Sequence, residues 1–125
     1  MEIRGTGSYL PGKIITNDDL SEVVDTNDEW ISSRTGICQR HISEGETTSE
    51  MAAKAAVAAL EDAEVSPEEV ELIIVATMTG DEAMPGTACK VQKEIGAVHA
   101  ACFDLSAACT GFVFALNTAN AYLAS

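Results

Sequence analysis

The sequence predicts an α/β fold in which helices cover a largely parallel sheet. Two short apolar segments, 72–77 and 100–105, have the length of strands, and the first is rich in β-branched residues without polar alternation. A segment of helical character lies between them. Two parallel strands need such a crossover between them, and the sequence of a strand that is covered on both faces is a continuous apolar run. The order strand, helices, strand, helix, strand, helix therefore predicts one layered α/β domain over residues 1–125.

The first third of the chain is expected to hold one strand and two short helices. Residues 3–9 have strand character and lead into a Pro-Gly turn. Asn17 is a suitable cap for a short helix with two acids in its first turn. A second helix is expected at 27–34, again with acids at its start. Three apolar side chains of the first helix are expected to face inward: Leu20, Val23 and Val24.

The middle of the chain is predicted to form a long helix that leads to the first buried strand. Thr47 and Glu50 have the spacing of a capping box. Small apolar residues then recur on one helical face as far as about Ala63, which predicts close packing on a sheet. Pro67 suits the first position of one further helical turn.

The last third is predicted to contain a helix, a strand and a closing helix. Pro85 is expected to start a helix that ends at Gly96, and residues 100–105 form the next strand. The final helix begins at about Cys109. The uncharged run 105–125 is long enough to cross a bilayer, but its polar side chains favour a buried helix of a soluble fold. These side chains are Ser106, Thr110, Asn117, Thr118 and Asn120.

The net charge of −13 is unevenly distributed. Residues 1–82 hold 18 acids and 5 bases, whereas residues 83–125 hold 2 of each. An acidic surface repels phosphates, which argues against nucleic acid and anionic membranes as partners. We expect the first part to be a solvated surface and the last third to be interior, or covered by another subunit.

The four cysteines, at positions 38, 89, 102 and 109, lack the spacing of zinc ligands, so no metal site is expected. The N-terminus has no apolar signal-peptide segment, because Glu2 and Arg4 precede a short strand-like stretch. The cytoplasm is therefore the expected compartment, where thiols stay reduced.

Cys109 is the strongest candidate for a catalytic residue. It follows a buried strand and a turn of small residues, and it stands at the start of an apolar helix. The positive end of a helix dipole stabilises a thiolate, which is the reactive form of cysteine. Ala107, Ala108 and Gly111 leave room for a substrate beside the sulfur. The alternative is that Cys109 is one more small core residue, and spacing alone leaves both interpretations open.

Several motifs in register resemble β-ketoacyl-acyl carrier protein synthase III, a family of thiolase-fold condensing enzymes. Residues 106–112, Ser-Ala-Ala-Cys-Thr-Gly-Phe, are similar to its nucleophile motif. Residues 5–11 resemble its opening strand and turn, and residues 25–31 and 34–37 resemble its coenzyme A-binding segment. The resemblance covers all 125 residues and implies the N-terminal part of the first βαβαβ half of a thiolase-like fold. Family members are much longer.

The resemblance implies a coenzyme A site on residues 26–34. Trp30 would stack on the adenine, Arg34 would pack on its other side or meet the phosphates, and Thr26 would form a hydrogen bond nearby. An indole face and a planar guanidinium both suit a flat base. A packing role is the alternative for Trp30, the only tryptophan of the sequence.

The resemblance also implies a reaction, in which Cys109 takes an acyl group from an acyl-CoA primer and condenses it with malonyl-acyl carrier protein. The coenzyme A thioester is then a substrate, no cofactor is tightly bound, and the enzyme is a homodimer. Met84 stands just before Pro85, at a position that reaches the acyl pocket of the partner subunit in this family. Ordinary interface packing is the alternative for Met84.

The His and Asn that complete the family's catalytic site belong to its later half, and no matching motif occurs here. His41, expected in a loop, and His99, expected before a strand, are assigned structural or solvent roles. We therefore expect the 125-residue chain to be inactive alone, as a truncated or cleaved enzyme or an incomplete reading frame. Two alternatives stay open. One is a related condensing enzyme that primes polyketide or quinolone synthesis or makes hydroxymethylglutaryl-CoA; the other is a non-catalytic fragment that retains the dimer surface.

Overall fold

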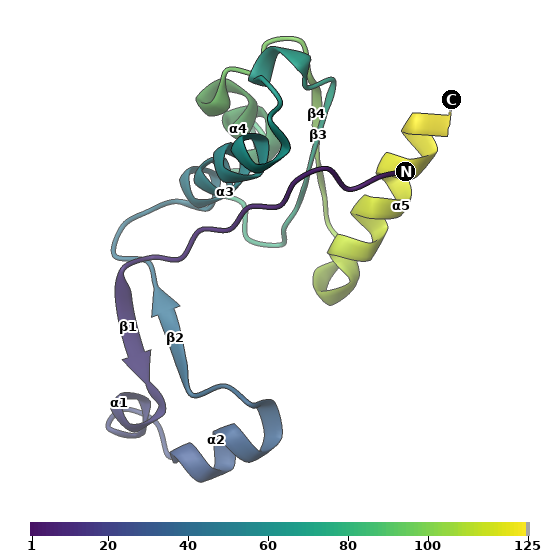
Figure 1. Ribbon diagram of the computed structural model, residues 1–125. Helices are drawn as coiled ribbons and strands as arrows, with labels where there is room; N and C mark the ends of the chain where they lie inside the picture. The colour runs from purple at the N-terminus through teal and green to yellow at the C-terminus, as the bar shows by residue number, and fades with distance from the viewer. Residues whose placement is uncertain (125) are drawn as a thin grey trace. The chain divides into compact units, whose positions relative to one another are not determined.

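The chain folds into two compact units, as the computed structural model in Figure 1 shows for residues 1–124. The first unit combines Met1–Tyr9 with Thr47–Ser125, and the second is the intervening segment Leu10–Glu46. Each unit has its own small sheet: β3 and β4 pair in the first, and β1 and β2 pair in the second.

The first unit contains the parallel pair that the sequence predicts. Strand β3 (Leu72–Ala76) runs parallel to β4 (Ala101–Leu105), with Leu72 opposite Ala101 and Ala76 opposite Leu105. The other elements are α3 (Thr48–Ala63), a 3₁₀ turn (Pro67–Glu69), α4 (Thr87–Ile95), a second 3₁₀ turn (Ala108–Thr110) and α5 (Gly111–Ala124). The crossover through α4 is what a parallel pair requires.

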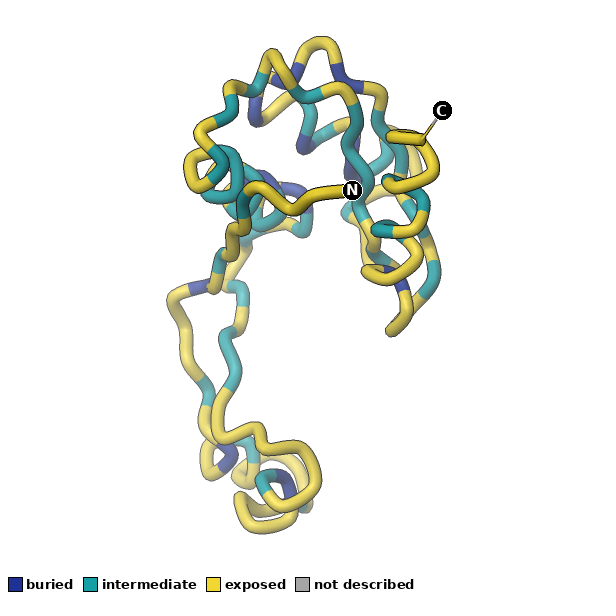
Figure 2. Tube along the Cα trace, turned by 45° about the vertical axis from the view of Figure 1, so that its right-hand side comes forward, coloured by how far each residue is buried: buried dark blue, intermediate teal, exposed yellow. Residues whose placement is uncertain are grey.

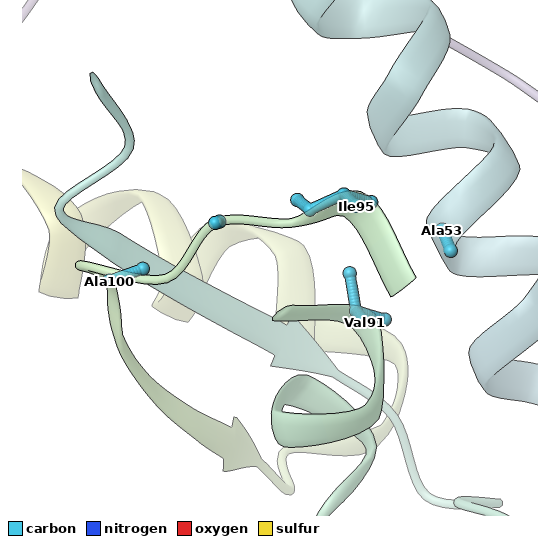
Figure 3. Close-up of a cluster of buried hydrophobic side chains, with 5 residues drawn as sticks. Ala53, Val91, Ile95 and Ala100 are labelled. Atoms are coloured by element: carbon cyan, nitrogen blue, oxygen red, sulfur yellow. The ribbon is translucent and has the colours of Figure 1, made fainter. Parts of the chain in front are cut away.

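Helices cover both faces of this sheet. On one face, Ile73 and Val75 of β3 pack against the apolar core between α3 and α4, of which Figure 3 shows Ala53, Val91, Ile95 and Ala100. On the other face, the Phe103 ring of β4 lies 6.1 Å from the Tyr122 ring of α5. Alternate residues of a strand point to opposite faces, so β3 and β4 are sandwiched between layers of helix.

Local signals set the ends of the helices of the first unit. Thr47 and Glu50 form the predicted capping box of α3: the Thr47 amide donates to Oε2 of Glu50 at 2.8 Å, and the Glu50 amide donates to Oγ1 of Thr47 at 3.2 Å. Helix α4 begins at Thr87, two residues after the predicted start at Pro85, and its last residue, Ile95, is followed by Gly96 as the expected cap. Gly96 has a φ of 77°, a left-handed conformation that favours glycine.

The predicted strand at 3–9 is wrong, because these residues are extended but pair with no strand of the described chain. They lie instead along α3. The Thr6 amide donates to Oδ2 of Asp62 at 2.8 Å, and a Cβ on Gly7 would collide with the backbone of Ala55 and Ala59. A ladder needs a neighbouring backbone at about 4.8 Å. The sheet of the first unit therefore has two strands instead of the expected three.

The second unit is built on an antiparallel pair that the sequence analysis missed. Strand β1 (Lys13–Thr16) pairs with β2 (Gln39–Ile42), with Lys13 opposite Ile42. His41, expected in a loop, lies in β2 opposite Ile14, and its Nδ1 is 2.6 Å from the carbonyl oxygen of Pro11. Helices α1 (Asn17–Ser21) and α2 (Asp28–Thr35) lie between the two strands in sequence.

Asn17 is a buried hub of the second unit and not the expected helix cap. The cap of α1 is Thr16, whereas the Asn17 residue is 1% exposed. Its Nδ2 donates at 2.7 Å both to Oδ1 of Asp28 and to the carbonyl oxygen of Ile37, and its Oδ1 accepts from Nη2 of Arg40 at 2.8 Å. These bonds hold α2 and β2 together. Two of the apolar residues expected to face inward, Val23 and Val24, are exposed and lie beyond the end of α1.

Helix α5 is apolar but largely exposed, in contrast to the buried helix that the sequence predicts. Phe112 is 71% exposed and Leu123 is 72% exposed, and exposed residues follow the whole helix in Figure 2. The helix therefore packs on β3 and β4 with one face only. Within residues 1–124, no helix combines the length and the hydropathy needed to cross a membrane.

Candidate active site

Cys109 lies in a tight turn between β4 and α5. Strand β4 ends at Leu105, a single 3₁₀ turn follows at Ala108–Thr110, and α5 starts at Gly111. Thr110 closes this turn, because its amide and its Oγ1 donate to the Ala107 carbonyl oxygen at 3.1 and 2.8 Å. The predicted location of Cys109, after a strand and at the start of the last helix, is thus confirmed to within one turn, although the strand is only partly buried.

The residue before Cys109 has a strained backbone. Ala108 has a φ of 45°, in the left-handed region that costs a residue with a Cβ about 1–3 kcal/mol. Such outliers persist only when the surrounding structure holds them, as the Thr110 hydrogen bonds and the packing of Gly111 do here. The strained turn leaves the Cys109 residue exposed, so that its thiol is accessible to a reagent.

An apolar pocket of about 1050 Å³ opens beside Cys109. It is lined by α3, β3 and α5, with Ala56, Ile74, Phe112 and Leu116 among its residues. Gly111 allows α5 to approach β3 here, because a Cβ at this position would lie only 3.2 Å from Cβ of Ala76. An apolar cavity with one reactive group at its edge suits a ligand with a hydrocarbon portion.

Asp104 fixes the end of β4 to the start of α4. Its Oδ2 and Oδ1 accept from the amides of Thr87 and Ala88, both at 2.7 Å. Both donor residues are buried, and Gly86 at the cap position has no side chain that could replace the carboxylate. The sequence analysis did not single out Asp104. An acid in a strand that is otherwise apolar was the signal for this role.

Met84 lies in the loop between β3 and α4, directly before Pro85, and is 85% exposed. This position leaves the side chain free for contacts outside the first unit. Its predicted place in the acyl pocket of a partner subunit stays a prediction.

Trp30 and Arg34 come together on α2 in the second unit. Cζ of Arg34 is 4.6 Å from the centre of the Trp30 ring, and Trp30 is 53% exposed. Asn27 holds the start of the helix, because its Oδ1 accepts from the Trp30 amide at 2.8 Å. Thr26 immediately precedes this cap and is half-buried. The guanidinium occupies one face of the indole, so a flat base would stack on the other face or displace the guanidinium.

The carboxylate of Asp28 holds the first turn of α2 in place. Hydrogen bonds from Asn17 and then from Ser32 lower the pKa of Asp28, because they favour its charged form. Ser32 Oγ donates to Oδ1 of Asp28 at 2.8 Å. Trp30 and Arg34 therefore lie on a helix whose first turn is held in place by the hydrogen bond between Asp28 and the buried Asn17.

The two histidines have the structural or solvent settings expected of them. His41 is held at the Pro11 carbonyl oxygen. His99 is exposed and precedes β4, whereas Cys109 follows that strand. A strand of this length spans roughly 17 Å at about 3.3 Å per residue, so His99 is out of reach of the Cys109 sulfur.

No protein-family model matches the chain. Among curated proteins, it is 62% identical to a β-ketoacyl-[acyl-carrier-protein] synthase III of Clostridium acetobutylicum over 123 residues, which are 98% of this chain and 38% of that protein. The fold is similar to a crystal structure of 3-oxoacyl-[acyl-carrier-protein] synthase III from Aquifex aeolicus, with a TM-score of 0.94, 50% identity and coverage of 98% of this chain and 40% of that one. It is also similar to the priming β-ketosynthase of the R1128 polyketide pathway, with a TM-score of 0.88, 42% identity and coverage of 92% and 35%.

Proposed function

Because the chain belongs to the β-ketoacyl-[acyl-carrier-protein] synthase III family and has its thiolase-like α/β fold, we propose that it supplies the nucleophile of an acyltransferase that initiates fatty acid synthesis. The chain spans 38% of the length of the curated relative described above, so the proposal concerns the part that these residues play in such an enzyme. The observation that carries it is the exposed Cys109 beside an apolar pocket at the start of α5.

In the first step, the Cys109 thiolate attacks the thioester carbonyl of an acyl-CoA. The carbonyl becomes a tetrahedral oxyanion, the coenzyme A thiolate leaves, and an acyl-enzyme thioester remains. The Cys109 amide stabilises the oxyanion, since the first amides of a helix are not used within it. The apolar pocket between β3 and α5 takes the hydrocarbon portion of the acyl group.

In the second step, malonyl-acyl carrier protein loses CO₂, and the resulting carbanion attacks the acyl-enzyme carbonyl. A β-ketoacyl product forms, and Cys109 leaves as the thiolate. The developing enolate needs hydrogen-bond donors, which the family provides as His and Asn. His99 does not reach Cys109, so we propose that residues outside this stretch supply these donors and that the 125 residues alone do not condense.

Coenzyme A is proposed to dock through its adenine on Trp30. The exposed indole face on α2 offers a stacking surface, and Arg34 contributes a cation for the phosphates or a second stacking plane. Thr26, next to the Asn27 cap, is placed for a further hydrogen bond. No tightly bound cofactor is needed for this chemistry.

Acyl carrier protein is proposed to dock on basic side chains outside residues 1–82. That segment has 18 acids against 5 bases, and carrier proteins are themselves acidic, so like charges would oppose docking there. We further propose a homodimer in which Met84 reaches the partner's acyl pocket, in line with its exposed position.

A second candidate is a synthase that primes polyketide synthesis. The similarity to the R1128 priming β-ketosynthase supports it. Both candidates use Cys109 in the same way and differ in the acyl primer. The profile of acyl-CoA chain lengths that acylate Cys109 distinguishes them, with acetyl-CoA preferred for fatty acid initiation.

The test is the intact mass of the protein after exposure to acetyl-CoA. We expect one added acetyl group, which peptide mapping places on Cys109. Cys109→Ala should abolish the addition, whereas Cys38→Ala, a change at another exposed cysteine, should not. Acetylation of Cys109→Ala at a different cysteine contradicts the nucleophile. A folded chain that takes up no acetyl group favours the non-catalytic fragment.

A further inference from the structure

Two of the cysteines that the proposed reaction does not use lie side by side in the first unit. The Sγ atoms of Cys89 on α4 and Cys102 on β4 are 3.1 Å apart. Sγ of Cys102 is also 3.3 Å from Oε1 of Gln92, one turn along the same helix. Cys102 is on the sheet face that α4 covers, because it is opposite Ile73 in the ladder.

This spacing is close to that of a bonded pair. A disulfide has an S–S length of about 2.05 Å, so the two sulfur atoms need to approach by roughly 1 Å. Both cysteines belong to regular elements, α4 and β4, that contact each other. A shift of the two side chains by roughly this distance would therefore bring the sulfurs to bonding distance.

The two thiols differ in their access to solvent. Cys89 is exposed and lines an open pocket of about 460 Å³ with Lys90 and Lys93, whereas Cys102 is half-buried. Burial, followed by the hydrogen bond to Cys89, raises the pKa of Cys102 to about 11. Cys89 is thus the thiol that meets a reagent first, and Cys102 is the one that resolves the adduct.

We propose that Cys89 and Cys102 form an oxidation site that a low-molecular-weight disulfide closes into an intrachain disulfide, which does not include Cys109. The Cys89 thiolate attacks one sulfur of the reagent and releases one small thiol, which leaves a mixed disulfide on Cys89. The Cys102 thiol, now held beside the mixed disulfide, gives its proton to water and attacks the Cys89 sulfur, which releases the second small thiol. The two protein thiols lose two electrons and two protons, and the reagent becomes two thiols.

The proposed bond would join α4 to β4 on the side of the sheet opposite α5. Asp104, two residues beyond Cys102, already fastens the same two elements through the amides of Thr87 and Ala88. The disulfide would therefore reinforce an existing contact. It does not depend on the proposed reaction, because Cys109 takes no part in it.

The test uses oxidised glutathione as the reagent and locates the bond by mass. The purified protein is incubated with oxidised glutathione, its remaining thiols are blocked with N-ethylmaleimide, and it is digested with trypsin and endoproteinase Asp-N. These proteases separate the three cysteines into peptides 81–90, 94–103 and 104–125. We expect 81–90 to be linked to 94–103, with two glutathione thiols released for each such link, and 104–125 to carry the maleimide or one glutathione but no second peptide.

Variants identify the two steps. Cys102→Ser should stop at a glutathione adduct on Cys89 and lose the linked peptide completely, whereas Cys38→Ser should retain the link. If Cys102→Ser does not fold, Cys89→Ser removes the link from the exposed side of the pair. The proposal is overturned if the unmodified protein keeps a stable adduct on Cys89, links Cys89 to 104–125, or joins two copies through Cys89 in place of the intrachain bond.

Discussion

Replacing Asp104 with alanine should remove two hydrogen bonds that attach β4 to the start of α4. The carboxylate accepts from two amides, both at 2.7 Å, whose residues are almost completely buried. A hydrogen bond to a charged group contributes about 1.5–3 kcal/mol, and a buried amide left without a partner costs about as much. Because Asp104 itself is exposed to water, we take the lower part of that range for each bond. We therefore expect Asp104→Ala to lower the free energy of unfolding by about 3–4 kcal/mol.

The assay is urea unfolding followed by circular dichroism, with the free energy extrapolated to water. Asp62→Ala is the matched control, because Asp62 also accepts from a backbone amide, that of Thr6, at 2.8 Å, but both residues are exposed. Water replaces that bond, so the control should lose only roughly 0.5–1 kcal/mol. Asp104→Asn should fall between the two, since its amide nitrogen faces one of the donors. Equal losses for Asp104→Ala and Asp62→Ala would refute the role of Asp104 as a buried helix cap.

Three further predictions concern other residues. Trp30→Ala should raise the KM for acyl-CoA in the complete enzyme and change the reaction of the acyl-enzyme with malonyl-acyl carrier protein much less; equal losses in both half-reactions would instead indicate misfolding. Met84→Phe should narrow the primers towards short straight chains, measured as an acyl-CoA profile, and an unchanged profile would leave Met84 as ordinary packing. Hydrogen bonds from Ser49, first through its hydroxyl, lower the pKa of Asp81, with a smaller contribution from Lys90. A carboxyl group whose pKa is lowered on folding stabilises the fold at pH values above its unfolded pKa of about 3.9, and this stabilisation is lost as the pH falls through the lower folded pKa. Asp81→Asn should therefore make the free energy of unfolding decrease less steeply below about pH 4. If the free energy of unfolding of Asp81→Asn fell as steeply with decreasing pH as that of the unmodified protein, this prediction would be wrong.

Elements with local signals could be predicted from the sequence. Helix α3 begins and ends where its capping box and its alanine-rich face indicate. Strands β3 and β4 were predicted to within one residue at each end, because buried parallel strands need continuous apolar runs. Elements that depend on distant partners could not be predicted. The Gln39–Ile42 strand has a polar sequence, and only its pairing with β1 makes it a strand.

The candidate site shows the same division. Cys109 could be located because a strand, a turn of small residues and an apolar helix are adjacent in sequence. The partners of Asp104 are backbone amides 16 and 17 residues away, and an amide carries no signature in the sequence. The contact between Cys89 and Cys102 was missed for a similar reason, since a helix residue and a strand residue 13 positions apart meet only once α4 packs on β4.

The antiparallel pairing of β1 with β2 has a consequence for how the chain tolerates change. The second unit, Leu10–Glu46, interrupts the first, and its two ends are drawn together where Lys13 pairs with Ile42. Because the two ends of this insertion are already paired with each other, the first unit closes over a short effective loop when it folds. The entropy cost of bringing the ends together is compensated by the contacts within the insertion. Changes of length or composition between β1 and β2 should therefore have little effect on the stability of the first unit, which contains Cys109. The sequence of the segment proposed to bind the adenine of coenzyme A can therefore diverge without displacing Cys109.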